Sequence, residues 1–404
     1  MCSRPTLRQT AAASLISALI LVVLPLSSAS AGSAGSRGAE FLGVAAGPRA
    51  AAMGEAQTAA VDGPYSAFWN PAGLGGLRYP EAAFAYARLA EGVDPQHAAY
   101  AHPVGVRKGL AASFTRLAIG PFDSYDANGA RRGSVDSEDL AISAAYGQRI
   151  FLTDASLPEI SAGFVGSYIS ERLHRTQSQT VSCGAGLLVS GLERTGADWA
   201  EGLRLGLAAR NIGPGMKFDA ERAGLPATVS LGLAWERKPW GDPATLALDY
   251  QARLDDSHYV GAGLEYVIRR VLAVRAGTLV GKNDGPDLRL GVGFSMKRLM
   301  VEYAWTGLNT VGDFHQMGLR YRFGGTVDVR EKTSDDFIDQ GKRYLRQNRI
   351  YEAAVEFNHA LETDPGNRQA LELLKQATEE RPVRPAASAT QAPAQTPSVP
   401  GGQP

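Results

Sequence analysis

Two short glycine-containing segments have a spacing that could serve phosphate binding. They are Gly261-Ala262-Gly263 and Gly291-Val292-Gly293. A nucleotide-binding loop of this kind needs a third glycine and a strand-turn-helix context, and both are missing here. Glycines at every second position of a strand are better explained as room on its inner face for another segment. We therefore expect no nucleotide site, and we expect another part of the chain to pack against these strands.

A partial calcium loop begins at Asp126. Asn128 and Gly129 follow at the spacing of such a loop, but the glutamate that would close it is missing. Asn-Gly is also the strongest short signal for a hairpin turn. We predict a turn here rather than an ion site, and the same interpretation applies to the Asn-Asp-Gly sequence at 283–285.

Histidine and cysteine show no arrangement that would serve metal binding or nucleophilic catalysis. The histidines are scattered without ligand spacing, at His97, His102, His174, His258, His315 and His359. Cys2 falls in a predicted leader, so Cys183 stands alone and no internal disulfide is possible. No Gly-x-Ser-x-Gly nucleophile elbow is present. We therefore predict a protein that is not an enzyme and holds neither metal nor cofactor.

The charges of the chain balance, with 41 Lys and Arg against 41 Asp and Glu among 404 residues. No basic excess points to nucleic acid as a partner. Within the predicted strands, charges of both signs occupy the face opposite to the apolar one. They are Arg204, Arg210, Asp249, Glu265, Arg275, Arg289, Glu302 and Arg320. Two interpretations stay open: these side chains pair with one another inside a filled lumen, or they form a ladder that guides a substrate.

The first 31 residues have the features of a secretory signal peptide. Arg4 and Arg8 precede an apolar stretch at 11–26, and the Ala-Ser-Ala sequence at 29–31 fits a cleavage site. The alternative, a membrane anchor, is disfavoured because the apolar stretch is short and small residues follow it. We assign residues 1–31 to a signal peptide and exclude them from the fold.

Residues 79–323 alternate between apolar side chains and polar or small ones. Leu203 and Leu205, for example, share one face, while Arg204 lies on the other. Strict alternation predicts β-strands. About fourteen such segments are recognised, near 81–89, 97–103, 108–117, 138–147, 158–169, 178–189, 202–211, 227–236, 243–251, 258–266, 271–279, 287–294, 297–304 and 314–323.

Most of these segments hold about 8–11 residues, the length that crosses a bilayer as a tilted strand. Aromatic side chains at the ends of the apolar face suit the bilayer interface. They are Trp235, Tyr250, Tyr266, Trp305, Tyr321 and Phe323. We predict an all-β transmembrane barrel of about 14 antiparallel strands, with a soluble sandwich as the alternative. The long connections at 118–137 and 212–226 follow odd-numbered strands, which predicts outward loops and periplasmic termini.

An Ala- and Gly-rich segment that is almost without charge precedes the strands. Residues 41–74 contain too few β-branched side chains for a good strand. Small residues in such numbers indicate close packing in a confined space, so we predict that residues 32–78 form a plug in the barrel lumen. Asn70-Pro71 disfavours a helix and Gly73 ends the element, which predicts a turn. The alternative is a helical hairpin that caps a soluble β domain.

The apolar period changes from strand-like to helical after a linker at 324–333. Helices are predicted at 335–348, 350–363 and 367–379. The first two match the 34-residue tetratricopeptide pattern. The matching positions are Phe337, Gly341, Tyr344, Ala353, Phe357, Ala360 and Pro365.

In this pattern, Gly341 and Ala353 are the small residues at the helix crossing, and Tyr344 and Phe357 fill the space between the helices. The third helix would cap the repeat, since one repeat cannot bury its own face. We therefore predict a small all-α, TPR-like unit over residues 334–381. The Pro-, Ala- and Gln-rich residues 382–404 predict a disordered tail.

Three runs in the N-terminal segment form a motif: Gly-Ala-Glu-Phe-Leu at 38–42, Gly-Pro-Arg-Ala-Ala-Ala-Met-Gly at 47–54, and Trp-Asn-Pro-Ala-Gly-Leu at 69–74. Through these runs the chain resembles the PorV/PorQ family of outer-membrane proteins, which is similar to the FadL fatty-acid transporters with 14 strands and an N-terminal plug. The resemblance covers roughly residues 38–323. The positions that carry it are Phe41, Gly47, Arg49, Met53, Gly54, Trp69, Asn70, Pro71 and Gly73.

The resemblance implies a bacterial outer-membrane barrel tied to protein export, since PorV carries cargo in type IX secretion. A tetratricopeptide tail departs from the family pattern and suggests docking to a periplasmic partner. The first hypothesis is a non-enzymatic secretion-associated shuttle or docking component, surrounded by outer-membrane lipid, whose periplasmic repeat binds a secretion-system or other periplasmic protein. The second is a FadL-like transporter of hydrophobic small molecules. The third is a barrel that only anchors the repeat.

Overall fold

The computed structural model describes residues 37–88, 93–150, 157–174, 176–218, 221–254, 257–281, 286–308, 312–324, 329–363 and 366–379. Several sequence predictions concern residues outside these ranges. They are the signal peptide at 1–31, the turn at 283–285, Pro365, residues 325–328 of the linker, and the tail at 382–404. The chain divides into two compact units, Met1–Val329 and Arg330–Pro404.

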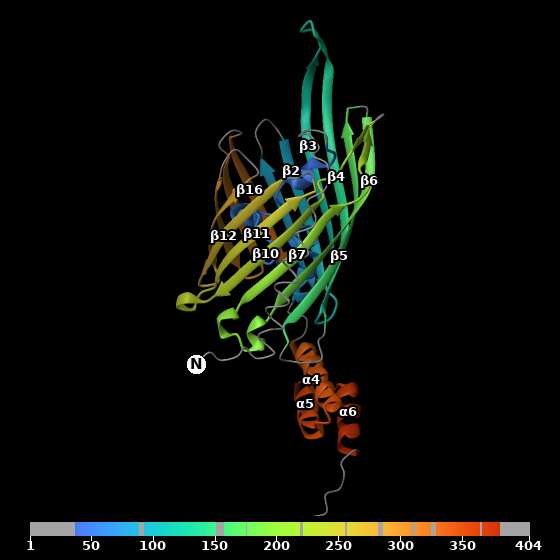
Figure 1. Ribbon diagram of the computed structural model, residues 1–404, viewed down its shortest axis with the longest axis vertical. Coiled ribbons are helices and arrows are strands. Elements are labelled where there is room, and N and C mark those ends of the chain that lie inside the picture. The colour runs from blue at the N-terminus through green and yellow to red at the C-terminus, as the bar shows by residue number, and fades with distance from the viewer. Residues whose placement is uncertain are drawn as a thin grey trace, which may run out of the picture. The chain divides into compact units, whose positions relative to one another are not determined.

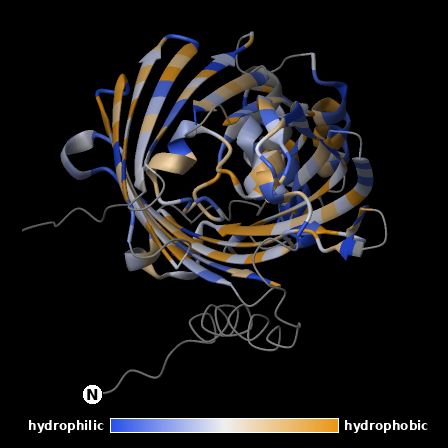
Figure 2. Ribbon diagram, turned by 90° about the horizontal axis from the view of Figure 1, so that it is seen from above, coloured by the Kyte–Doolittle hydropathy of each residue, from blue (hydrophilic) through white to orange (hydrophobic). Residues whose placement is uncertain are grey.

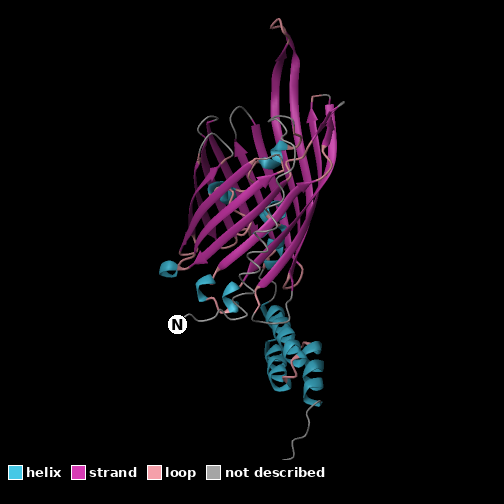
Figure 3. Cartoon of the chain, in the orientation of Figure 1, coloured by secondary structure: helices cyan, strands magenta, loops and turns pink. Residues whose placement is uncertain are grey.

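The first unit is a closed antiparallel β-barrel (Figure 3). Its order around the ring follows the chain, and the last strand pairs with the first. The barrel strands are β1 (Glu81–Arg88), β2 (Val93–Pro103), β3 (Lys108–Tyr125), β4 (Arg131–Ile150), β5 (Glu159–Leu173), β6 (Thr176–Ser190), β7 (Leu203–Ile212), β10 (Thr228–Arg237), β11 (Ala244–Arg253), β12 (His258–Ile268), β13 (Leu272–Val280), β14 (Leu288–Met296), β15 (Leu299–Leu308) and β16 (Gly312–Arg322).

The connections contain a few short elements. A small hairpin, β8 and β9, lies between β7 and β10, and three 3₁₀ turns follow β6 and β10. Their bounds are β8 (Met216–Phe218), β9 (Glu221–Ala223), η5 (Leu192–Thr195), η6 (Asp198–Ala200) and η7 (Pro239–Gly241). Among the helices of the described residues, none is both long enough and apolar enough to cross a bilayer.

The barrel confirms the fold class expected from the alternating sequence. Every predicted strand segment corresponds to one of the barrel strands. On β14, Leu288 is 57% exposed on the outside, while the neighbouring Arg289 is 4% exposed and faces the lumen. Figure 2 shows this pattern as alternating apolar and polar bands along the strands. Because the outer face is apolar, the sheet is inverted relative to a soluble barrel, whose apolar face would point inward.

The connection predicted at 118–137 is not a loop, and that prediction is wrong. Strands β3 and β4 hold 18 and 20 residues and continue through it as a hairpin that rises beyond the neighbouring strands (Figure 1). Cross-strand pairs such as Phe122 with Val135 extend almost to the turn, after an irregularity beyond Ile119. The sequence does not predict this extension because both faces of the hairpin are exposed there. The alternation of apolar and polar residues is therefore lost, while the backbone hydrogen bonds continue.

The predicted turn at Asp126 is present at the tip of this hairpin. The backbone N–H groups of Ala130 and Asn128 each donate to Asp126 Oδ1 at 2.9 Å. These two hydrogen bonds stabilise the ionised carboxylate and therefore hold the pKa of Asp126 below its usual range. The acidic side chain thus closes a turn, as the Asn-Gly sequence predicts.

The segment before β1 lies inside the barrel as a series of short turns, which we call the plug (residues 37–80). Figure 2 shows it within the ring of strands. Its elements are η1 (Glu40–Gly43), α2 (Pro48–Ala52), η2 (Gly63–Tyr65), α3 (Ser66–Trp69) and η3 (Pro71–Gly76). Prolines lie in the first turn of α2, η2 and η3. Proline suits this position because the backbone N–H that it lacks would have no partner within the helix there. Gly73 does not end an element as predicted, because η3 runs through it.

The second unit contains three helices: α4 (Val329–Arg346), α5 (Ile350–Thr363) and α6 (Arg368–Glu379). Helix α4 begins six residues before the predicted start at 335, so part of the predicted linker is helical. Phe357 and Ala353 of α5 are fully buried together with Ala377 of α6. These contacts form a small core within this unit.

Candidate functional site: the plugged lumen

Glycines on the inner faces of the strands bring the plug into direct contact with the barrel wall. A Cβ atom at Gly263 would lie 2.5 Å from the Met53 carbonyl oxygen, and one at Gly277 would lie 2.6 Å from that of Ala52. Such distances leave no room for any side chain. The glycines that meet plug atoms in this way are Gly109, Gly147, Gly163, Gly186, Gly206, Gly232, Gly261, Gly263, Gly277, Gly291 and Gly318.

The expectation that inner-face glycines make room for a plug therefore holds at Gly261, Gly263 and Gly291. Gly293 differs, because it faces the side chains of Met300 and Arg275 instead. The glycines come from strands all around the barrel, so the plug backbone touches the wall on many sides. Such contacts fix the plug by shape alone, before any charge is considered.

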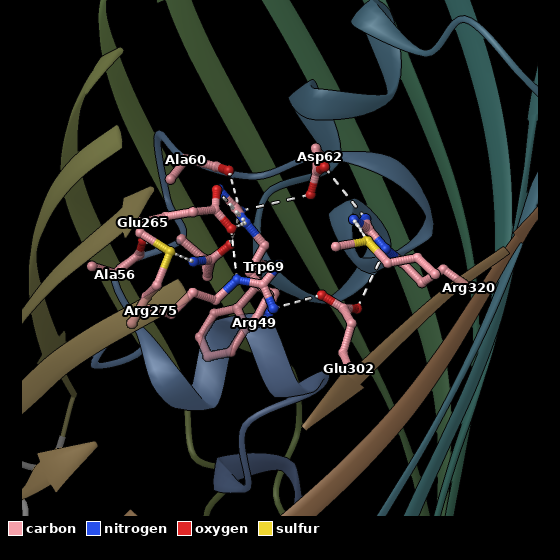
Figure 4. A network of polar contacts seen from close by, with 12 residues as sticks. Arg49, Ala56, Ala60, Asp62, Trp69, Glu265, Arg275, Glu302 and Arg320 are labelled. Carbon is pink, nitrogen blue, oxygen red and sulfur yellow. Dashed lines mark hydrogen bonds and ion pairs between the residues drawn. The ribbon is translucent and has the colours of Figure 1, made fainter. Parts of the chain in front are cut away.

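A buried network of charges connects Arg49 of the plug to the barrel wall (Figure 4). Arg49 Nη2 lies 2.9 Å from Glu265 Oε1, and its Nη1 donates to the Ala60 carbonyl at 2.8 Å. Arg275 Nε lies 2.6 Å from Glu265 Oε2, and Arg275 Nη1 lies 2.8 Å from Glu302 Oε1. Arg320 Nε extends the network to Glu302 Oε2 at 3.4 Å. The network joins the plug to β12, β13, β15 and β16.

A second charged contact holds the loop after α2. Arg289 Nη1 of β14 lies 3.1 Å from Glu55 Oε1 of the plug, and Arg289 Nη2 lies 2.9 Å from Asp287. Asp249 Oδ2 of β11 accepts from the backbone N–H groups of Gln57 and Thr58 at 2.9 and 2.8 Å. The barrel thus supplies side-chain partners for plug backbone groups that the short plug elements leave unsatisfied.

Asn70 provides a third contact, and its side chain is fully buried. Its Nδ2 donates to the carbonyl oxygens of Thr58 at 2.7 Å and Leu187 at 3.1 Å, while its Oδ1 accepts from Ala72 N–H at 3.1 Å. One side chain therefore caps η3, ties two plug segments together and reaches β6. Sequence reasoning found only the turn at this residue.

The other motif residues of the plug are also placed in the lumen. Phe41 is 4% exposed and packs with Met216, while Met53 is fully buried. Gly47 has a φ of 93° and lies under the Tyr65 ring, so it needs both glycine's conformational freedom and its lack of a side chain. The remaining contacts are those of Gly54 with the Thr278 carbonyl, Trp69 Nε1 with the Ala46 carbonyl at 3.0 Å, Pro71 with Gly147 and Gly163, and Gly73 with Ser66 and Val61.

The charges predicted on the inner face fall into three groups, the first of which is Asp249 with its hydrogen bonds to the plug backbone. Glu265, Arg275, Arg289, Glu302 and Arg320 form buried ion pairs, which is the pairing interpretation rather than the guiding ladder. The two remaining arginines, Arg204 and Arg210, lie on β7. Arg204 Nη2 lies 3.9 Å from Glu236 Oε2, and Arg210 Nη2 donates to Gln251 Oε1 at 3.2 Å. Sequence reasoning missed Glu55, because no periodicity marks a charge in an irregular segment.

The β8–β9 connection covers the start of the plug. Gly38 N–H donates to the Gly224 carbonyl at 3.1 Å, and Arg37 forms a parallel bridge with the same residue. Met216 of β8 is fully buried against this part of the plug. The predicted outward connection at 212–226 therefore folds over the lumen.

A small cavity lies between the plug and the wall near this cover. Its free space is about 30 Å³, enough for a few water molecules. A wider, more open pocket of about 870 Å³ lies at the opposite ends of β7 and β10 and includes Arg204 and Trp235. Within the described part of the chain, no three His, Cys, Asp or Glu side chains gather closely enough to hold a metal ion.

In the helical unit, the described residues that match the tetratricopeptide pattern pack between α4, α5 and α6. A Cβ at Gly341 would overlap the Phe357 ring, so this crossing requires glycine. Ala353 and Ala360 are fully buried. The Phe337 ring lies 5.3 Å from that of His359, and Arg349 stacks on Tyr344 at 4.6 Å.

No family model and no curated protein matches this sequence. Solved structures with a similar backbone include a Pseudomonas aeruginosa FadL homologue, at 11% identity and a TM-score of 0.44, covering 69% of this chain and 98% of that chain. The CymD monoaromatic hydrocarbon channel has 12% identity and a TM-score of 0.46 over 69% and 98%. A mutant of the TodX monoaromatic hydrocarbon channel has 10% identity and a TM-score of 0.43 over 69% and 99%.

Proposed function

We propose that this chain is a plugged outer-membrane β-barrel that works as a non-enzymatic docking component rather than as an open pore. The observation that carries the proposal is the plug, whose Arg49 forms a buried ion pair with Glu265 and whose backbone rests on glycines of the wall. A segment held in the lumen by both charge and shape would obstruct free diffusion through the barrel. A function in binding partners is therefore better supported than a porin-like one.

The outer face of the barrel supports a membrane location. Ten of its strands hold 8 to 11 residues, which suits a tilted strand across a bilayer. Large apolar side chains are exposed on this face, among them Leu246, Leu248, Leu264, Leu288, Leu290, Val292, Val301 and Leu319. Exposed aromatic residues accompany them at Trp235, Tyr250, Tyr321 and Phe323. In water such a surface would aggregate, whereas lipid covers it at no cost.

The hairpin of β3 and β4 offers a surface for a partner. Pairing with β2 ends at Ile119, and on the side of β5 the last backbone hydrogen bond runs from His174 N–H to the Asp136 carbonyl. Beyond these residues, neither edge pairs with another strand of the described chain. Free strand edges add strands from other chains through backbone hydrogen bonds. Phe122 and Tyr125 are 49% and 59% exposed on this hairpin and would add apolar contacts.

The helical unit offers a second surface. Its match to the tetratricopeptide pattern favours protein binding, and a periplasmic location follows if both barrel termini face the periplasm. Together with the PorV/PorQ-type motif, this supports a secretion-associated role in which the hairpin meets cargo or a surface partner and the helices meet a secretion-system or other periplasmic protein.

A pull-down from mildly solubilised outer membranes tests this proposal. Three chains are compared: the intact protein, one lacking residues 334–381, and one in which Asn-Gly replaces residues 120–136. A chain that lacks only residues 382–404 is the matched control for the helical deletion. We expect intact protein and control to recover secretion components, and each altered chain to lose one class of partner. Recovery of the barrel alone in every case would refute the docking role.

Transport of hydrophobic small molecules is the second candidate, because a cavity lies beside the plug at Phe68 and Trp69. Uptake of a labelled fatty acid or aromatic hydrocarbon by liposomes that contain the purified barrel would test it. Uptake above that of empty liposomes, without ion conductance, would favour transport over docking.

A further inference from the structure

Arg210 differs from the other buried arginines of the lumen because it has no carboxylate partner. Its side chain is 9% exposed and extends from the inner face of β7. Among the contacts of the described residues, its guanidinium forms no ion pair: Nη2 donates to Gln251 Oε1 at 3.2 Å, and the buried Nε has no hydrogen-bond partner. Arg49, Arg275 and Arg289 each lie within 3.1 Å of a carboxylate. The carboxylates of Glu55 and Asp249 act on this buried charge without forming an ion pair with it, so an anion in direct contact would stabilise the fold.

The guanidinium is held in place by aromatic rings of the plug. Its central carbon lies 4.8 Å from the ring centre of Trp69 and 5.7 Å from that of Phe68. Stacking of this kind fixes the plane of the guanidinium and leaves its edge available for hydrogen bonding. The arrangement orients a donor edge rather than merely accommodating a flexible side chain.

The backbone of β7 is distorted where Arg210 leaves it. Between Cys183 and Ala185 of β6, the register shifts so that Arg210 and Asn211 together lie opposite one residue, Gly184. Asn211 has a φ of 57°, in the left-handed region. Such a bulge changes the direction of a side chain and is common beside functional sites.

Arg210 points into the cavity of about 30 Å³ between plug and wall. Besides Arg210, the residues most relevant to its chemistry are Phe68, Trp69, Thr228, Gln251, Arg253 and Tyr259. The acidic Glu55 also borders the cavity, but its Oε1 lies 3.1 Å from Arg289. Arg253 is paired with Glu40 at 2.9 Å. The free space admits an ion or a terminal group of a few atoms, not a long ligand lying along the cavity.

We propose that this cavity binds a compact anionic group, either a halide ion or the carboxylate of a small acid, which pairs with the free edge of Arg210. The hydroxyl group of Tyr259, which accepts from Arg253 Nη1 at 3.4 Å, would donate a further hydrogen bond to the same group. This site is independent of the docking role, because it requires neither the β3–β4 hairpin nor the helical unit.

The melting temperature of the purified full-length protein in detergent tests the proposal. It is measured against increasing sodium chloride or sodium acetate, with the sodium salt of HEPES, a bulky sulfonate without a carboxylate, keeping the ionic strength constant. We expect a saturable rise of about 2 °C or more, because a ligand that binds only the folded state raises its stability. In Arg210→Gln the rise should disappear. Arg204→Gln, on the same strand and face but in the other pocket, should keep it.

Comparison of chloride, acetate and longer acids shows whether the bound anion is a free ion or part of a larger ligand. Equal effects of chloride and acetate indicate a free ion, whereas an effect only of longer acids such as octanoate indicates the head group of a larger ligand. No rise with chloride, acetate or octanoate in the wild-type protein would overturn the proposal.

A second measurement avoids the risk that Arg210→Gln does not fold. Crystals of the wild-type protein soaked in sodium bromide should show an anomalous peak next to Arg210 in the cavity. Peaks at exposed arginines alone, meaning adventitious ions only, would also overturn the proposal.

Discussion

Arginine–carboxylate pairs occur both in the lumen and in the projecting β3–β4 hairpin, in very different surroundings. Arg275 and Glu302 lie 2.8 Å apart with side chains 1% and 0% exposed. Arg131 and Asp123 lie 2.7 Å apart with side chains 63% and 43% exposed. The distances are almost the same, yet water screens the second pair and not the first. Distance alone therefore does not tell what an ion pair does for this protein.

The comparison separates the two regions by function. In the lumen, each charge of the network that links Arg49, Glu265, Arg275 and Glu302 depends on its partner, so the network fixes where the plug lies. In the hairpin, the charges keep an exposed two-stranded ribbon soluble, but they contribute little to its stability. A buried interior thus carries an exposed hairpin that a partner can approach.

Among these variants, loss of Glu265 should lower the free energy of unfolding the most. Glu265→Gln leaves Arg49 without its closest carboxylate and removes one of the two that Arg275 contacts. We expect the free energy of unfolding to fall by about 3–5 kcal/mol, because an uncompensated charge remains buried. Denaturant unfolding followed by tryptophan fluorescence measures this, and limited proteolysis reports whether the plug is released. An unchanged midpoint with a protected plug would show that the network is dispensable.

Substitution of a glycine in the barrel wall should cause the second largest loss of stability. In Gly263→Ala the new methyl group would meet the Met53 carbonyl, so the plug or β12 must shift. We expect a loss of about 1–3 kcal/mol, as for other overpacked cores. Gly166→Ala is the matched control, since its Cβ would meet nothing closer than 4.0 Å. If both variants melt alike, contact between glycine and plug does not determine stability.

Replacement of Asn70 and Pro71 by alanine should loosen the plug to a similar or smaller extent. The change removes three hydrogen bonds of the Asn70 side chain and leaves the carbonyl oxygens of Thr58 and Leu187 without this donor. The expected loss is about 1–3 kcal/mol. Faster protease cleavage within residues 37–80 of the detergent-extracted protein would reveal it. Unchanged thermal stability and protease resistance would contradict the role given to this turn.

Removal of an ion pair in the β3–β4 hairpin should change the free energy of unfolding the least. Asp123→Asn removes the exposed pair with Arg131, and we expect a change below about 1 kcal/mol. The same denaturant experiment as for Glu265→Gln checks this prediction directly. A loss as large as that of the lumen variant would remove the distinction between the two regions.

Much of the barrel could be predicted from sequence because strand alternation is a local signal. Leu288 and Arg289 differ in polarity, and this difference alone assigns one to the outer face and the other to the lumen. The extension of β3 and β4 could not be predicted in this way. Residues 120–136 have no buried face, so their strand pairing depends on the neighbouring strand and not on polarity.

The sequence by itself determined the strands, their inner and outer faces, the helical character of the C-terminal unit and the presence of small residues before the barrel. All of these follow from residue type and short-range spacing. Only the tertiary structure decided that Arg49 meets Glu265 across 216 positions of sequence, that Gly263 lies under Met53, and that Arg210 has no carboxylate partner among the described residues. Those contacts form only when the barrel closes around the plug, because closure brings residues together that no local pattern connects.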